Sequence, residues 1–137
     1  MDANSVTDQP TPDEVHFPLK DFLGMEIVRG DGTAAAWVDL GPDHLNPNGI
    51  VHGAVTFALM DTAMGAAVVS ILNDDQLCAT IEIHTRYHRP AATGTLRAEA
   101  KVLTAGRRLV QLQARTTDDD GRLIASATGS FAVFTAR

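Results

Sequence analysis

The sequence predicts an α+β fold in which a strongly curved antiparallel sheet wraps one long central helix. Residues 49–72 form an apolar stretch whose only formally charged residue is Asp61. Six shorter segments are strand candidates, two before this stretch and four after it. The connectors between the last four segments are short and turn-like, which favours antiparallel neighbours.

The composition suits a single packed domain. The chain has 137 residues and a mass of 14.6 kDa, with 45% hydrophobic and 20% charged residues, which excludes wholesale disorder. Seventeen acidic residues against 11 basic ones leave a net charge of −6, which argues against nucleic acid or an anionic membrane as the main partner. Cys78 is the only cysteine, so no intrachain disulfide forms and we expect a cytoplasmic protein.

The N-terminal residues differ in character from the rest. Residues 1–11 are polar, contain proline and lack any basic residue or apolar run, so we expect a short flexible tail and no secretory signal. Residues 12–137 then form one domain. Its first element, over residues 12–23, is a short helical or turn segment that Pro18 interrupts.

Two strand candidates precede the apolar stretch. Residues 25–29 and 33–40 flank a Gly-Asp-Gly turn and predict a hairpin. The apolar stretch at 49–72 is long enough to span a membrane. However, Asp61 lies near its middle, it is rich in alanine and no positive flank follows it, so we expect a helix surrounded by the domain.

The last four strand candidates cover residues 77–89, 95–104, 107–117 and 122–134. In the first of these, strict alternation places Ile81, Ile83 and Tyr87 on one face. Thr80 falls on the opposite face, so contact between Thr80 and a group facing Ile83 requires a bulge or bend in the strand.

Residues 44–61 carry the chemically informative pattern, with polar residues and glycines at the helix entrance and Asp61 further along. Backbone N–H groups at a helix start lack partners, and an unobstructed one at Gly53 suits a carbonyl oxygen. A carboxylate in apolar surroundings is costly unless it is paired or used. Asp61 is therefore a candidate general base or nucleophile, and a purely structural carboxylate is the alternative.

Gly53 and Asp61 are eight residues apart, about 12 Å along a helix. One helix therefore does not bring both groups to one carbonyl carbon. Two copies of the chain with antiparallel helices would do so, in a two-fold dimer with two identical sites.

The spacing Asn46-x5-His52-Gly53-Ala54-x6-Asp61 resembles the motif of the PaaI-type acyl-CoA thioesterases of the hot-dog fold, in which a second glycine stands in place of Ala54. The segment 79–91, with its Arg-Pro ending, resembles the long strand of that family. The resemblance covers about residues 23–134. It implies hydrolysis of an acyl-CoA thioester to a carboxylic acid and CoA, with CoA as part of the substrate and no further cofactor.

The resemblance also implies roles for individual residues. Asp61 would activate water or attack directly, and the Gly53 N–H would polarise the carbonyl from the other subunit. Asn46 and His52 would position the thioester, with Asn46 orienting the imidazole, and Thr80 would hold the water. The implied assembly is a homodimer as the minimal active unit, arranged as a dimer of dimers.

Candidate substrate-binding residues are of two kinds. Arginines suit the phosphates of CoA; the candidates are Arg86, Arg89, Arg107 and Arg108. Side chains of the apolar helix are expected to shape the acyl pocket; these are Phe57, Met60 and Met64.

Other interpretations remain open at this point. His84 and His88 share a strand face, but their spacing matches no zinc pattern, and no metal is expected. A non-catalytic acyl-CoA-binding module would keep the fold and the Gly53 cradle. An acyl-CoA hydratase or dehydratase would need an Asp and a His a few residues apart, whereas His52 and Asp61 are nine apart.

Overall fold

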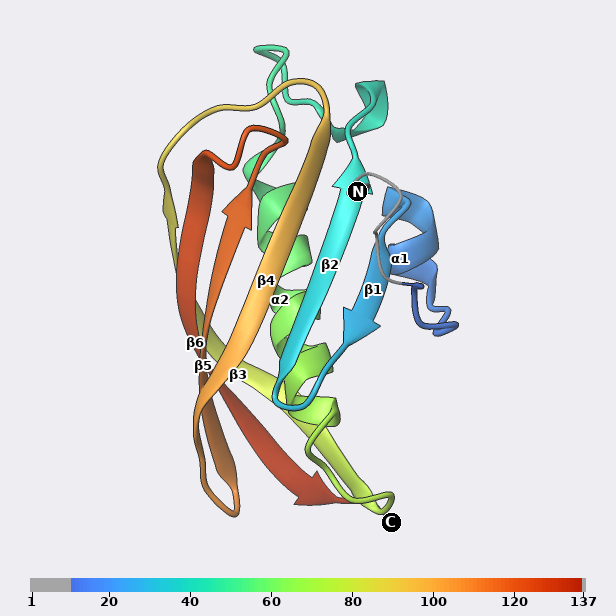
Figure 1. Cartoon of the computed structure of the whole chain (residues 1–137), viewed down its shortest axis with the longest axis vertical. Helices are drawn as coiled ribbons and strands as arrows, with labels where there is room; N and C mark the ends of the chain where they lie inside the picture. The colour runs from blue at the N-terminus through green and yellow to red at the C-terminus, as the bar shows by residue number, and fades with distance from the viewer. Residues whose placement is uncertain (1–10, 137) are drawn as a thin grey trace, which may run out of the picture.

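The computed structural model describes residues 11–136 and has the predicted α+β architecture (Figure 1). Its helical elements are α1 (Pro18–Leu23), the 3-10 turn η2 (Pro42–His44) and α2 (Gly53–Val69). Its strands are β1 (Glu26–Arg29), β2 (Thr33–Asp39), β3 (Gln76–Tyr87), β4 (Thr95–Ala105), β5 (Leu109–Thr117) and β6 (Leu123–Thr135). The predicted tail lies outside the described residues, apart from Thr11.

All strands belong to one antiparallel sheet with the order β1-β2-β4-β5-β6-β3. The predicted hairpin of β1 and β2 is confirmed. The expectation that short connectors make all four later strands sequential neighbours is wrong for one pair. β3 pairs with β6 instead of β4, because residues 88–94 cross the end of the sheet from one strand to the other (Figure 1).

The core lies between α2 and the concave face of the sheet (Figure 1). Residues at helical spacing along α2 face the sheet: Val55, Thr56, Leu59, Met60, Ala63, Met64, Ala67 and Val68 are buried. The expectation that the helix is surrounded on every side is wrong for the single chain. Phe57 and Val69, on the side away from the sheet, remain 37% and 43% exposed. One side of α2 is therefore free to contact another molecule.

The helix limits differ from the sequence prediction. α2 begins at Gly53 instead of residue 49, because Gly49 adopts a left-handed φ of 78° and the following residues remain in a loop. It ends at Val69 instead of residue 72. Pro18 begins α1 instead of interrupting it, as suits a residue with a fixed φ and no N–H. No helix in residues 11–136 is both long and apolar enough to cross a bilayer.

Candidate active site

The start of α2 presents an unpaired donor. His52 is the N-cap, and its Nδ1 accepts the Ala54 N–H at 2.9 Å. The His52 carbonyl accepts the Val55 N–H at 2.9 Å. Across the described chain, no group accepts from the Gly53 N–H. The cap therefore satisfies the neighbouring amides and leaves the Gly53 amide available to a ligand oxygen.

Tyr87 packs directly on Gly53, a contact that the sequence analysis did not foresee. The Tyr87 hydroxyl donates to the Gly53 carbonyl at 2.8 Å. A Cβ added to Gly53 would lie 3.3 Å from the Tyr87 ring and hydroxyl, so the small residue is needed for this close approach. Burial raises the pKa of Tyr87 above its ordinary value, a direction consistent with a protonated hydroxyl that donates to the Gly53 carbonyl.

Within residues 11–136, the Asp61 carboxylate has a single hydroxyl partner. The Thr80 hydroxyl donates to Asp61 Oδ1 at 2.7 Å. This contact depends on a bulge in β3: Thr80 pairs with Phe131 and Glu82 with Ser130, which leaves Ile81 as an extra residue. The bulge is the irregularity that the alternation pattern required.

The bulge also explains how β3 contacts α2 at two places. Thr80 and Tyr87 are seven residues apart, so regular alternation would put them on opposite faces. The extra residue changes the parity, and both side chains therefore reach α2, at Asp61 and Gly53. One strand thus positions both ends of the candidate site.

Cys78 lies on the same face of β3 as Thr80, close to Asp61 of α2. Its Sγ is 4.0 Å from the Gly65 carbonyl oxygen. Burial, and to a lesser degree the negative charge of Asp61, raises the pKa of the Cys78 thiol above its ordinary value. The thiol is therefore a neutral neighbour of the carboxylate and a poor nucleophile.

Asn46 folds its own loop in the single chain. Its Oδ1 accepts the N–H groups of Asn48 at 2.9 Å and Ile50 at 3.3 Å, the geometry of an Asx turn. Within residues 11–136 it makes no hydrogen bond to His52. In the single chain, the Asn46 side-chain oxygen therefore accepts hydrogen bonds from its own loop and none from the His52 imidazole.

His44 supports this loop, a role that the sequence did not predict. It is buried, its Nδ1 accepts the Gly41 N–H at 2.9 Å, and its Nε2 donates to the Leu23 carbonyl at 2.8 Å. The backbone donor and acceptor together require the neutral imidazole with its proton on Nε2. His44 thereby ties the helix entrance to the end of α1.

A cavity of about 440 Å³ opens at the Gly53 end of α2. Tyr87, Arg89 and Pro90 line it together with Gly53, Ile50 and Thr56. Arg89 is the one arginine among the four candidates that lines this cavity; its Nη1 also contacts the Leu123 carbonyl at 3.4 Å.

The other candidate substrate-binding residues lie elsewhere in the single chain. Arg107 and Arg108 occupy the β4–β5 turn, at the opposite end of the molecule from Gly53 (Figure 1). Arg86 lines a hollow together with His84 on the outer face of the sheet. Met60 and Met64 are fully buried in the core, so neither lines an open pocket. Phe57 lies on the uncovered side of α2.

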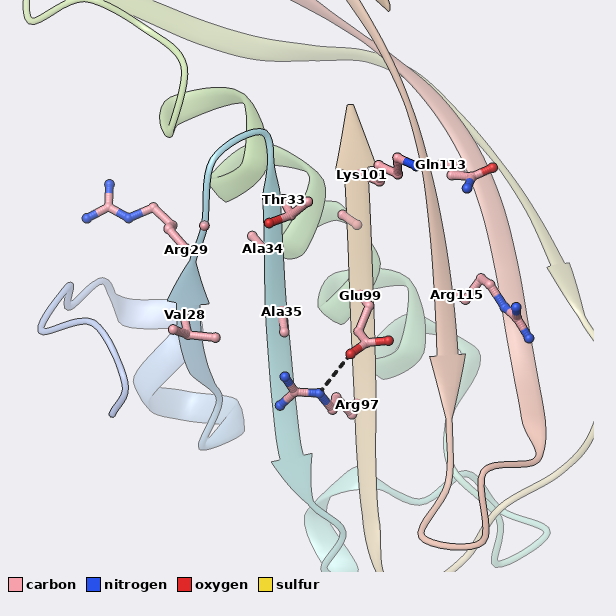
Figure 2. A pocket seen from close by; sticks show the side chains of 12 residues that line it. Val28, Arg29, Thr33, Ala34, Ala35, Arg97, Glu99, Lys101, Gln113 and Arg115 are labelled. Atoms are coloured by element: carbon pink, nitrogen blue, oxygen red, sulfur yellow. Dashed lines mark hydrogen bonds and ion pairs between the residues drawn. The ribbon is translucent and has the colours of Figure 1, made fainter. Parts of the chain in front are cut away.

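Another hollow, of about 460 Å³, does not belong to this site. It lies on the outer face of β1, β2, β4 and β5, with α2 behind the sheet (Figure 2). Arg97 there bonds Glu99 at 3.2 Å and stacks 5.1 Å above the Trp37 ring. No grouping of three or more His, Cys, Asp or Glu suited to a metal occurs in the part of the chain that the structure describes.

Comparison with known proteins identifies the family. The model of the thioesterase superfamily matches residues 48–125, which include Gly53, Asp61 and Thr80. The chain belongs to the thioesterase superfamily. It is 31% identical over 119 residues to ComA2 of Bacillus subtilis, covering 84% of this chain and 93% of that protein.

Further relatives agree with this assignment. The chain is 28% identical over 116 residues to the proofreading thioesterase EntH of Cronobacter turicensis, covering 84% and 85% of the two chains. Among solved structures, the conserved protein PA5202 of Pseudomonas aeruginosa superposes with a TM-score of 0.83 at 33% identity, over 87% of this chain and 95% of that one. The thioesterase superfamily chain described here therefore has the predicted hot-dog fold.

Proposed function

We propose that this thioesterase superfamily member hydrolyses acyl-CoA thioesters at a site shared by two copies of the chain, as in the PaaI-type enzymes that its motif resembles. The hydrogen bond from Thr80 to Asp61 carries this proposal. It holds one carboxylate oxygen in place and leaves the other for a water molecule or an acyl carbon. The name of the EntH relative also favours thioester hydrolysis.

The electrophilic side of the reaction is assigned to Gly53 of the second copy. Its unpaired N–H, at the positive end of α2, would donate a hydrogen bond to the thioester oxygen as negative charge develops there. Water oxygen bonds to the carbonyl carbon and gives its proton to Asp61. The C–S bond then breaks, and the CoA thiolate leaves and takes up a proton. Direct attack by Asp61, through an anhydride that water then cleaves, is the alternative route.

Two surfaces support the dimer on which this mechanism depends. β3 is a terminal strand of the sheet, and its apolar Leu77 and Ile81 are exposed in the single chain. An open, apolar strand edge favours pairing with another strand. The uncovered side of α2 contains Asp61, so pairing along β3 would bring a second, antiparallel α2 alongside it.

The test is release of CoA from a panel of acyl-CoAs, followed with a thiol-trapping reagent. We expect turnover by the native protein and at least a hundredfold loss in Asp61→Asn, about the contribution of a positioned base, with an unchanged melting temperature. Asp43→Asn, an exposed carboxylate on η2, is the matched control and should retain full activity.

Three results would contradict the proposal. Binding of acyl-CoA without thiol release would indicate the non-catalytic binding module. Hydration of an enoyl-CoA without thiol release would indicate a lyase. A parallel loss of melting temperature and activity in Asp61→Asn would assign the carboxylate to structure.

A further inference from the structure

A polar hollow of about 280 Å³ lies on the outer face of the sheet, the face that does not pack on α2. Its lining comes from three neighbouring strands, β5, β6 and β3. The described residues that line it include no carboxylate, although the chain carries a net charge of −6. Six of them can donate hydrogen bonds from their side chains: His84, Arg86, Gln113, Arg115, Ser126 and Thr128. The hollow therefore suits an anion.

The strand register places two arginines on either side of one hydroxyl. Ser126 of β6 is the partner of Arg115 on β5 and of Arg86 on β3. Neighbouring strands lie about 4.8 Å apart, so the two arginine backbones are about 10 Å apart. Their long side chains can therefore reach one group placed above the Ser126 hydroxyl.

A second row of donors runs beside the first. Thr128, two residues after Ser126 and on the same face, is the partner of Gln113 on β5 and of His84 on β3. His88 Nε2 lies 2.8 Å from Ser126 Oγ, which fixes this hydroxyl at the centre of the first row. Two adjacent rows thus offer donors to several oxygens of one ligand.

The two arginines are not neutralised by acidic side chains. Within residues 11–136, neither Arg86 nor Arg115 forms an ion pair. Glu99 lies opposite Arg115 on β4, but its carboxylate accepts from Arg97 at 3.2 Å. Guanidinium groups match the geometry of phosphate oxygens. An anion between the two arginines would also offset their mutual repulsion.

We propose that this outer-face hollow binds a phosphate group, free or as the monoester of a small molecule, at a site separate from the thioesterase site. Arg86 and Arg115 would donate to its oxygens from two sides, with the Ser126 hydroxyl between them. Gln113 and Arg115 also line the neighbouring hollow of about 460 Å³ (Figure 2). That hollow leaves room for the organic part of an ester. The sheet separates both hollows from α2.

The test is a titration of isotope-labelled protein with sodium phosphate and with glycerol phosphate, followed by two-dimensional NMR. Sodium chloride keeps the ionic strength constant. We expect saturable shifts of amide signals in β5, β6 and β3 around the hollow. Arg86→Gln and Arg115→Gln should each weaken binding at least about tenfold, because each removes charge-assisted hydrogen bonds. Binding of both probes would indicate an ester site, and binding of phosphate alone a site for the free anion.

The matched control removes the same charge elsewhere. Arg122→Gln lies on the β5–β6 turn, where Arg122 pairs with Asp118 at 2.9 Å, and it should bind phosphate as the native protein does. Melting temperatures verify that the variants fold, as expected for exposed side chains. Shifts without saturation, or equal affinity in all three variants, would reduce the effect to general screening and overturn the proposal.

Calorimetry with CoA separates this site from the proposed function. Phosphate binding is measured without any thioester, so it does not depend on hydrolysis. Unchanged CoA affinity in Arg115→Gln would support a separate site, as would phosphate binding by a protein that does not bind CoA. Weakening of CoA and phosphate by the same factor in Arg115→Gln would assign the hollow to the substrate and overturn the inference.

Discussion

Asp61 combines two features that are separately common and together informative. It lies on an otherwise apolar helix, and it accepts a hydroxyl hydrogen bond of 2.7 Å from a strand contributed 19 residues later. A charge-assisted bond of this kind is stronger than a neutral one. The hydroxyl therefore fixes the orientation of the carboxylate while leaving one oxygen for chemistry.

The charge of Asp61 should be measurable through Cys78. Burial raises the pKa of this thiol most, and the Asp61 carboxylate raises it further. The reactive form is the thiolate, so both effects slow alkylation at neutral pH. Asp61→Asn removes the second effect, lowers the thiol pKa and should therefore speed iodoacetamide modification at pH 7.

Mass spectrometry over a pH series gives the apparent pKa, because Cys78 is the only cysteine. The rate profile should move to lower pH in Asp61→Asn and remain unchanged in Asp43→Asn. An unchanged profile in both variants would show that the carboxylate does not influence the thiol in solution.

At the scale of single residues, the sequence predicted the residues that a motif spacing identifies. Gly53 and Asp61 stand at the helix positions that the motif indicated, and Thr80 reaches Asp61. Tyr87 was not foreseen, because its contact with Gly53 joins residues 34 apart and depends on strand parity. The supporting role of His44 was not predicted either, since it depends on the position of the Leu23 carbonyl at the end of α1.

Among the elements, α2 depends on its cap. His52 Nδ1 takes up the Ala54 N–H, and loss of an N-cap side chain costs about 1 kcal/mol. His52→Ala should therefore lower the melting temperature by several degrees, as expected for about 1 kcal/mol in a domain of this size. His52→Asn, whose oxygen can cap the same amide, should restore it.

Activity measured on the same variants separates the role of His52 in capping from its role in positioning the substrate. If the imidazole also positions the thioester, His52→Asn regains stability but not kcat/KM. Full recovery of both quantities in His52→Asn would reduce the role of His52 to that of a cap.

Element boundaries and neighbours were the least predictable features. The limits of α2 are set by the left-handed Gly49 and the His52 cap, local events that hydrophobicity does not reveal. The pairing of β3 with β6 depends on closure of the whole sheet. By contrast, the bulge at Ile81 followed from a conflict in the sequence itself, between strict alternation and the need for Thr80 to face the helix.

At the scale of the whole molecule, the single chain separates the two halves of the proposed site. Gly53 begins α2, whereas Asp61 lies two turns further along it. The antiparallel dimer that we propose would oppose these positions across a two-fold axis. The dimer would therefore be part of the catalytic apparatus and not an accessory to stability.

Complementation between two inactive variants tests this arrangement. Gly53→Ala should be inactive because its new Cβ, 3.3 Å from the Tyr87 ring and hydroxyl, crowds the helix entrance where the thioester oxygen would approach the amide N–H. Asp61→Asn should be inactive for lack of the carboxylate. A mixed dimer would combine both substitutions in one site and leave the other intact. Random exchange of equal amounts should thus restore about a quarter of native activity per protomer.

The matched control mixes Asp61→Asn with Asp61→Ala, a pair in which every site lacks the carboxylate, and should restore nothing. Mixed dimers isolated through two different affinity tags would verify subunit exchange. Activity of such verified dimers no higher than that of the parents would place Gly53 and Asp61 in the same chain's site or in separate sites. Recovery close to a quarter, absent from the control, would require that each active site draws its amide from one copy and its carboxylate from the other.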